Sequence, residues 1–187
     1  KPVTDVLRKG DATDTGTKIT FMPDDKIFED VVFSSDILTK RLREQAFLNR
    51  GIKIKLFDER TKEGNVFHYE GGIVSFVEYL NRNKDVLNEK PIYMSGTRDN
   101  MEVEVALQYN DTYIEKVLTF ANNINTQEGG THLVGFRTAL TRTFNDYIRK
   151  MNLLKESDPN LTGEDVREGL TAVISVRLSN PQFEGQT

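Results

Sequence analysis

The chain has 187 residues, of which 37% are hydrophobic and 29% charged, and its formal net charge is −4 at pH 7. This balance is typical of a globular protein, and it excludes both an intrinsically disordered chain and a strongly basic nucleic-acid-binding protein. Because the sequence contains no cysteine, disulfides, thiolate zinc sites and a cysteine nucleophile are also excluded.

The first part of the chain contains two candidate strands. Residues 1–8 and 18–24 have strand character, and the turn-forming residues 11–17 (DATDTGT) separate them. The polar stretch 23–35 then predicts a boundary between this strand pair and the rest of the chain.

A helix, a hairpin and a second helix are predicted next. Ser34 or Ser35 is a candidate N-cap for the first helix, and Gly51 supplies its C-terminal stop. The alternation of Ile and Lys that follows is typical of a strand with one buried face. The predicted elements are a helix at 36–50, strands at 52–58 and 66–70 joined by a turn at 61–65, and a helix at 71–83.

The second half predicts three strands, a long helix, a short helix and a last strand. Residues spaced four, four, four and three apart form a continuous apolar stripe on the long helix. These residues are Phe136, Leu140, Phe144, Ile148 and Met151. Thr162 and Asp165 predict a capping box at the start of the short helix. The predicted ranges are strands 91–97, 101–109 and 116–123, helix 128–154 and strand 170–178. This mixed order predicts an α+β fold rather than a regular βαβ array.

Glycines stand before the long helix, in EGGTHLVGF (128–136). A helix N-terminus can bind an anion, but this sequence matches neither established glycine-rich phosphate motif. We therefore expect Gly129 and Gly130 to permit a tight turn and Thr131 to cap the helix. The turn at 14–17 (DTGT) is likewise interpreted as a plain turn on its residues alone, with a ligand contact by Thr17 as the alternative.

The chain has two histidines, His68 and His132, and neither stands near a carboxylate cluster at metal-ligand spacing. We expect His68 to be a hydrogen-bonded structural residue. Arg137, Arg142 and Arg149 lie on the long helix. At about 100° per residue, Arg142 lies roughly 140° from Arg137 and about 20° from Arg149. These charges form either a partial basic face toward DNA or an ordinary solvated surface, and the pattern alone leaves both interpretations open.

Several long motifs, taken together, resemble the ATPase subunits of bacterial type II DNA topoisomerases. The resemblance is to the B subunits of DNA gyrase, with the paralogous topoisomerase IV subunits close behind, and it covers essentially all 187 residues. The motifs are TGTKITFMPDDKIF, RLREQAFLNRGIKI, FHYEGGIVSFVEYLN, VEVALQYND, FANNINTQEGGTHLVGFRTALTR, DPNLTGEDVREGLTAVISV and PQFEGQT.

The resemblance implies a domain organisation. Residues 1–30 would be the last strands of an ATP-binding domain of the gyrase, Hsp90, histidine-kinase and MutL type. Residues 31–187 would be a transducer domain with the fold of ribosomal protein S5 domain 2. The chain begins without Met and ends at Gln-Thr, so we expect it to be part of a longer protein.

The resemblance also implies site residues. Gly16 and Thr17 match a Gly-Thr pair whose hydroxyl helps to hold adenine. Gln186 matches a glutamine that contacts the γ-phosphate of ATP, and the family's lysine would follow directly after Thr187. Arg137 matches a basic residue that faces the DNA cavity between two subunits.

The remaining implications concern the whole subunit. It would hydrolyse ATP with Mg²⁺, form a homodimer on binding ATP, and act on DNA with the gyrase A subunit in the cytoplasm, away from any membrane. Because the catalytic glutamate, the Mg²⁺-binding asparagine and the DNA-cleaving tyrosine have no counterpart in this chain, we expect no catalytic residue here and no activity from the chain alone. The alternative from another functional class is a non-catalytic module that binds nucleic acid or protein.

Overall fold

The computed structural model of the protein describes residues 3–18, 23–155 and 157–183. The chain forms two compact units, residues 1–34 and residues 35–187.

Residues 3–18 of the first unit are exposed and contain no strand. The strand predicted at 1–8 is therefore wrong for the residues that are described. A strand is held by ladder hydrogen bonds to a neighbour, and none of these residues pairs with one, so Val3 and Val6 remain fully exposed. In the second predicted strand, residues 19–22 lie outside the described residues.

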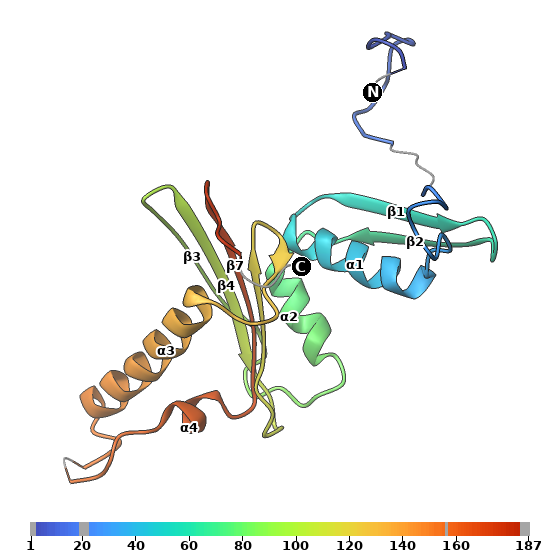
Figure 1. Ribbon diagram of the computed structural model, residues 1–187. Helices are drawn as coiled ribbons and strands as arrows, with labels where there is room; N and C mark the ends of the chain where they lie inside the picture. Colours follow the sequence, from blue (N-terminus) through green and yellow to red (C-terminus); the bar gives the residue numbers. More distant parts are fainter. Residues whose placement is uncertain (1–2, 19–22, 156, 184–187) are drawn as a thin grey trace. The chain divides into compact units, whose positions relative to one another are not determined.

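A five-stranded mixed sheet is the centre of the second unit (Figure 1), and its strand order is β3-β4-β7-β5-β6. The strands are β3 (Ile92–Arg98), β4 (Met101–Tyr109), β5 (Lys116–Ala121), β6 (Ile124–Asn125) and β7 (Leu170–Arg177). The strand β7 is last in sequence but central in space, antiparallel to β4 and parallel to β5. Seven of its eight residues are buried, because helices cover both faces of the sheet.

Helices α1 (Ser35–Leu48) and α2 (Ile73–Asn81) pack on one face of the sheet. Phe47 of α1 and Phe76 of α2 stack with ring centroids 4.6 Å apart, and Val173 of β7 belongs to the same apolar cluster. The hairpin of β1 (Lys53–Asp58) and β2 (Glu63–His68) packs against α1 through the buried Phe67.

Helices α3 (Thr131–Lys150) and α4 (Gly163–Arg167) belong to the opposite face. Alternate residues of a strand point to opposite faces, so Ala172, Ile174 and Val176 form a second cluster with Phe136 and Leu140 of α3. The apolar stripe predicted for this helix is therefore confirmed at its start.

The rest of the stripe is only partly covered. Phe144 makes an edge contact with Tyr109, Met151 is 51% exposed, and no residue of α3 is fully buried.

Most of the predicted elements in the second unit are confirmed, including the capping box of Thr162 and Asp165 at the start of α4. Two local predictions are wrong. The strand β2 begins at Glu63, so residues assigned to the turn are in the strand. Gly130, with φ 144°, precedes α3, and Thr131 is already its first residue rather than its cap. In addition, the strand β6 was not predicted, because two residues are too few to show an alternation of apolar and polar side chains.

The α+β class is confirmed by this mixture of a sheet with helices on both faces. Across residues 3–18, 23–155 and 157–183, no helix is both long enough and apolar enough to cross a membrane.

Four buried polar side chains connect α2, β4, β7 and the residue that follows β4. Asn81 donates to Gln108 over 2.9 Å and accepts from Thr171 over 2.8 Å, and Asn110 donates to Thr171 over 3.2 Å. Because buried polar groups without partners are costly, this network favours one register of β7 against β4. The backbone N–H of Asn110 also donates to the carbonyl oxygen of Gly169 over 3.0 Å, just before β7 begins.

Gly169 is the position where an added methyl group should disrupt this arrangement most. It has φ 70°, and a Cβ would lie 2.3 Å from the carbonyl oxygen of Asn110 and 2.8 Å from that of Thr112. We expect Gly169→Ala to reduce the free energy of unfolding by about 2–5 kcal/mol, through backbone strain and overpacking. Urea denaturation measures this change. In the matched variant Gly135→Ala, on α3 with open space around the position, stability should rise by about 0.5–1 kcal/mol. A Gly169→Ala protein as stable as the wild type would contradict the steric argument.

Candidate functional site

The carboxylate of Glu115, just before β5, binds two arginines: Arg137 of α3 and Arg167 of α4. The Oε1 atom of Glu115 accepts from the Nε and Nη2 atoms of Arg137 over 2.9 and 2.8 Å. Its Oε2 atom accepts from Nε of Arg167 over 3.2 Å. The Arg167 side chain is 18% exposed and that of Glu115 is 25% exposed, so this ion pair is screened less than a surface pair.

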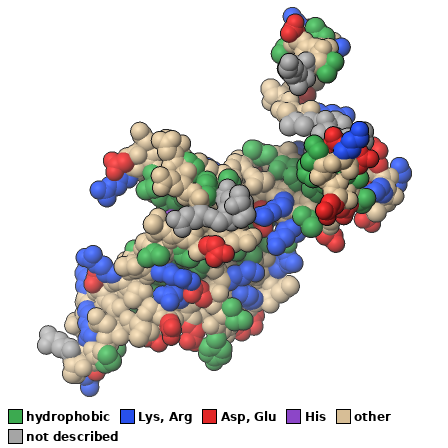
Figure 2. Space-filling model, viewed as in Figure 1, with side chains coloured by type: hydrophobic (Ala, Val, Ile, Leu, Met, Phe, Trp, Pro, Cys, Tyr) green, Lys and Arg blue, Asp and Glu red, His purple; other side chains and the backbone are tan. Residues whose placement is uncertain are grey.

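A groove of about 480 Å³ lies beside this cluster. Arg137, Arg142 and Arg167 contribute three positive charges to its lining and Asp146 contributes one negative charge, whereas its other side chains are threonines and asparagines. Figure 2 shows Lys and Arg side chains over α3 and α4, with carboxylates among them. Guanidinium, hydroxyl and amide groups in one groove can bind phosphate oxygens, so the groove is the candidate anion-binding surface of the second unit.

The arginines predicted on α3 do not all belong to this groove. Arg142 is highly exposed and lies 3.5 Å from Asp146. In contrast, Arg149 donates to the side chain of Asn160 over 2.9 Å and to the backbone carbonyl of Lys155. Arg149 therefore anchors the loop after α3.

The structure adds Arg167 and Glu115, which the sequence pattern did not indicate. They lie 30 and 22 residues from Arg137, and no local periodicity relates such positions.

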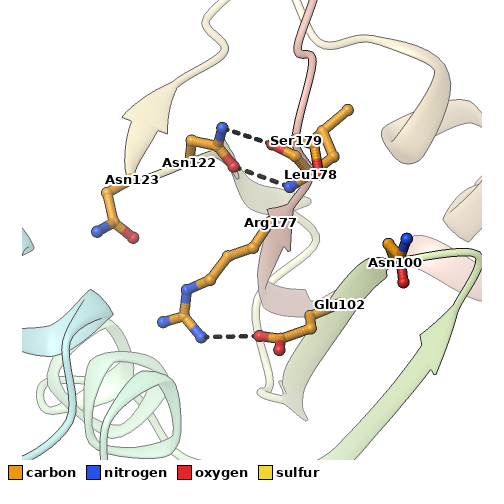
Figure 3. Close-up of a pocket in the computed structure, with 7 residues that line it drawn as sticks. All are labelled: Asn100, Glu102, Asn122, Asn123, Arg177, Leu178 and Ser179. Atoms are coloured by element: carbon orange, nitrogen blue, oxygen red, sulfur yellow. Dashed lines mark hydrogen bonds and ion pairs between the residues drawn. The ribbon is translucent and has the colours of Figure 1, made fainter.

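A second polar surface lies at the end of β7, in a groove of about 440 Å³. Figure 3 shows the Asn122 side chain aligned with the backbone of Leu178. Its amide nitrogen donates to the Leu178 carbonyl oxygen over 2.9 Å, and its oxygen accepts from the Leu178 N–H over 2.9 Å. The side chain thus continues the parallel ladder between β5 and β7 by one further step, and it directs the chain as it leaves the sheet.

The same surface is connected to the end of α1. Asn123 donates to Asn49 over 2.9 Å and accepts from Gln45 over 3.1 Å. Arg177 donates to the carbonyl oxygen of Leu48 over 3.1 Å, and its guanidinium lies 3.6 Å from the carboxylate of Glu102 (Figure 3). Arg177 thereby satisfies a C-terminal carbonyl of α1 that has no partner within the helix.

Two of the three nucleotide-contact residues implied by the resemblance lie in the described part of the chain. Gly16 and Thr17 are exposed in the first unit, and nothing lies within 4 Å of a Cβ built on Gly16. Gln186 lies outside the described residues. A contact of these three residues with one nucleotide therefore stays a prediction.

Both histidines have structural partners. His68 contacts the carbonyl oxygen of Ile52 at 3.3 Å and Glu70 at 2.8 Å, in agreement with the structural role expected for it. His132 contacts the hydroxyl of Thr126 at 3.2 Å, and burial lowers its pKa. Among the described residues, no group of three or more His, Asp or Glu side chains could hold a metal ion.

A sequence profile for the DNA gyrase B family matches residues 72–187. The curated relatives include the DNA gyrase B protein of Clostridium acetobutylicum, 63% identical over 95% of this chain and 28% of its own length. Another is the DNA gyrase B protein of Halalkalibacterium halodurans, 59% identical over all of this chain and 30% of its own length. The chain thus spans just under a third of the length of these two relatives.

Solved structures show the same similarity. The 43K ATPase domain of Thermus thermophilus gyrase B, in complex with an aminocoumarin, is 43% identical with a TM-score of 0.77 over 87% of this chain and 44% of that one. A topoisomerase IV ATP-binding domain of Francisella tularensis is 26% identical with a TM-score of 0.70 over 88% of this chain and 44% of that one.

Removal of the Asn122 side chain should release the backbone of Leu178. In Asn122→Gly, which tolerates the φ of 48° at this position, we expect the Leu178 amide to exchange its hydrogen faster and stability to fall by about 1 kcal/mol. In Asn122→Asp the acceptor for the Leu178 N–H is retained, so that amide should stay protected. Hydrogen exchange measured by NMR distinguishes the two variants. Equal protection of Leu178 in Asn122→Gly and the wild type would contradict the proposed ladder extension.

Proposed function

The chain belongs to the DNA gyrase B family, and from this premise we propose that it is part of the ATP-driven clamp of a type II DNA topoisomerase. In this proposal it couples ATP binding and hydrolysis by the whole subunit to DNA strand passage and negative supercoiling. The observation that carries the proposal is the likeness to the gyrase B ATPase domain over 87% of this chain. The relatives at 63% and 59% identity are both gyrase B proteins, which favours gyrase over the alternative of a topoisomerase IV ATPase subunit.

We assign residues 1–30 to the end of the ATP-binding domain and residues 31–187 to the transducer domain. The second unit observed, residues 35–187, supports the second assignment, because it has its own two-sided core. The partners proposed for the whole subunit are DNA, the gyrase A subunit and a second copy of itself, and its proposed location is the cytoplasm.

Gly16, Thr17 and Gln186 are proposed to contact ATP. The exposure of Thr17 and the open space at Gly16 fit a contact with a ligand. When bound, ATP would supply a γ-phosphate that ADP lacks, and an amide of Gln186 can donate to it. Mg²⁺ is proposed as a cofactor of the whole subunit; because no group of three or more His, Asp or Glu side chains among the described residues could hold a metal ion, we assign no metal ligand to this chain.

Arg137 is proposed to face DNA, and Arg142 shares the groove with it. Their side chains are 40% and 82% exposed, so each can present N–H groups to phosphate oxygens. This surface lies on the face of the sheet opposite α1 and α2. The alternative of a non-catalytic binding module loses support, because the relatives are gyrase subunits over the whole of this chain.

In the full-length protein, Gln186→Ala should reduce the rate of ATP hydrolysis more than it weakens ADP binding. The physical reason is that the glutamine would touch a phosphate that ADP does not have, so its contribution appears only in the triphosphate state. Steady-state kinetics and ADP titration measure the two effects. A hydrolysis rate equal to that of the wild type would contradict the role of Gln186.

In Arg137→Ala, we expect duplex DNA to bind more weakly and the slope of log K against log salt to become shallower by about 0.9, the value for one phosphate contact. Fluorescence anisotropy at several salt concentrations measures both quantities. Lys40→Ala is the matched control, because it removes one exposed positive charge from α1 on the other face of the sheet. Equal losses in the two variants would indicate only a general effect of net charge.

A further inference from the structure

Glu115 contacts two of the three arginines that line the basic groove on α3 and α4. It bonds Arg137 through one oxygen and Arg167 through the other, at distances of 2.8–3.2 Å. The carboxylate therefore reduces the charge of this pair of arginines from +2 to a net +1. An anion that enters the groove meets this counter-charge together with the arginines.

The backbone around Glu115 holds the carboxylate in place. The preceding loop is fixed by Asn110, whose Oδ1 atom accepts from the backbone N–H of Thr112 over 3.0 Å and from its hydroxyl over 2.6 Å. The following residue, Lys116, begins β5 and pairs with Thr171 of β7. Glu115 is thus anchored on both sides, and it is not a side chain at the tip of a free loop.

The bonds to Glu115 occupy part of the donor set of Arg137. A guanidinium has five N–H donors, and Nε and Nη2 each direct one toward Glu115, which leaves three for another acceptor. A DNA phosphate at this guanidinium would therefore share it with a carboxylate already bound. Arg142 forms a longer ion pair of 3.5 Å with the exposed Asp146, and a pair so exposed to solvent restrains the guanidinium much less.

We propose that Glu115 is a built-in competitor for DNA phosphate, which keeps the hold of this groove on duplex DNA weak and reversible. The inference rests on the proposed function, in which Arg137 faces DNA. Repulsion between the carboxylate and phosphate, and the shared guanidinium, both lower affinity. A weak hold suits that function, because a duplex that is passed through a clamp must also leave it.

The test compares Glu115→Gln with Glu59→Gln in the full-length protein. Both variants remove one negative charge and keep the side-chain length, but Glu59 is exposed in the β1–β2 turn, on the other side of the sheet. Binding of a duplex oligonucleotide is followed by fluorescence anisotropy over a range of salt concentrations. We expect Glu115→Gln to tighten binding about 3- to 10-fold and to steepen the salt slope, with a change below about 2-fold in the control. Equal or weaker binding by Glu115→Gln relative to Glu59→Gln would overturn the proposal.

Two further variants show whether the effect acts through Arg137. In an Arg137→Ala background, Glu115→Gln should tighten binding less than it does with Arg137 present, because the competition for that guanidinium has been removed and only the repulsion and the contact with Arg167 remain. Glu115→Asp retains the negative charge and should bind within about 2-fold of the wild type. Undiminished tightening in the Arg137→Ala background, or tightening by Glu115→Asp, would contradict competition at this guanidinium.

The proposal can also be tested without any Glu115 variant, in case these variants do not fold. Since Glu115 competes for Arg137 and not for Arg142, Arg142→Ala should lose more DNA affinity than Arg137→Ala in the otherwise unchanged protein. The reverse order counts against the proposal. If neither arginine variant loses affinity, the proposed DNA-facing role of α3 fails; if both lose it while Glu115→Gln matches Glu59→Gln, only the role of Glu115 fails.

Discussion

Burial of β7 between β4 and β5 is the constraint on which the second unit depends. Eight residues of this strand pair with β4 and six pair with β5, and its side chains enter the apolar clusters on both faces of the sheet. The other four strands precede β7 in sequence, and β4 and β5 are joined in the sheet only through β7. The five-stranded sheet therefore cannot form until β7 has paired with both of them. Long-range pairing of this kind makes folding slow relative to that of locally connected elements. The hydrogen-bonded polar residues Asn81 and Thr171 then select one register.

The two ends of β7 place both candidate surfaces. At its beginning, Gly169 approaches the backbone of Asn110, whose loop leads to Glu115 and so to the arginines of α3 and α4. At its end, Arg177 binds the last turn of α1, and Asn122 binds the backbone of Leu178. β7 has ladder hydrogen bonds to β4 and β5, so the strand cannot lengthen without breaking them, and it fixes the separation between the two surfaces.

The elements of the second unit could be predicted because their signals are local. The alternation before Asp58, the stripe through Phe136 and Leu140, and the capping box at Thr162 each depend on residues within a few positions. The strand predicted at 1–8 was wrong over its described residues, because a strand needs a neighbouring strand to pair with. The local sequence pattern does not show whether such a neighbour is present. Likewise, Arg137 was expected from the resemblance, but its bond to Glu115 joins residues 22 positions apart and follows only from the packing of α3 beside β5.

Glu115 with its partners Arg137 and Arg167 also shows why the net charge of a chain says little about its binding surfaces. A chain with a net charge of −4 carries a groove lined by three arginines and one aspartate, because net charge does not fix where the charges lie. Within the groove, the charge available to a phosphate is set by contacts and not by composition: Arg167 is 18% exposed and held by Glu115, Arg137 is shared, and Arg142 is open to solvent. The three arginines carry the same charge, but they differ in the number of N–H groups that remain available to bind a phosphate. The packing of α3 and α4 around one carboxylate therefore determines how strongly this surface can hold an anion.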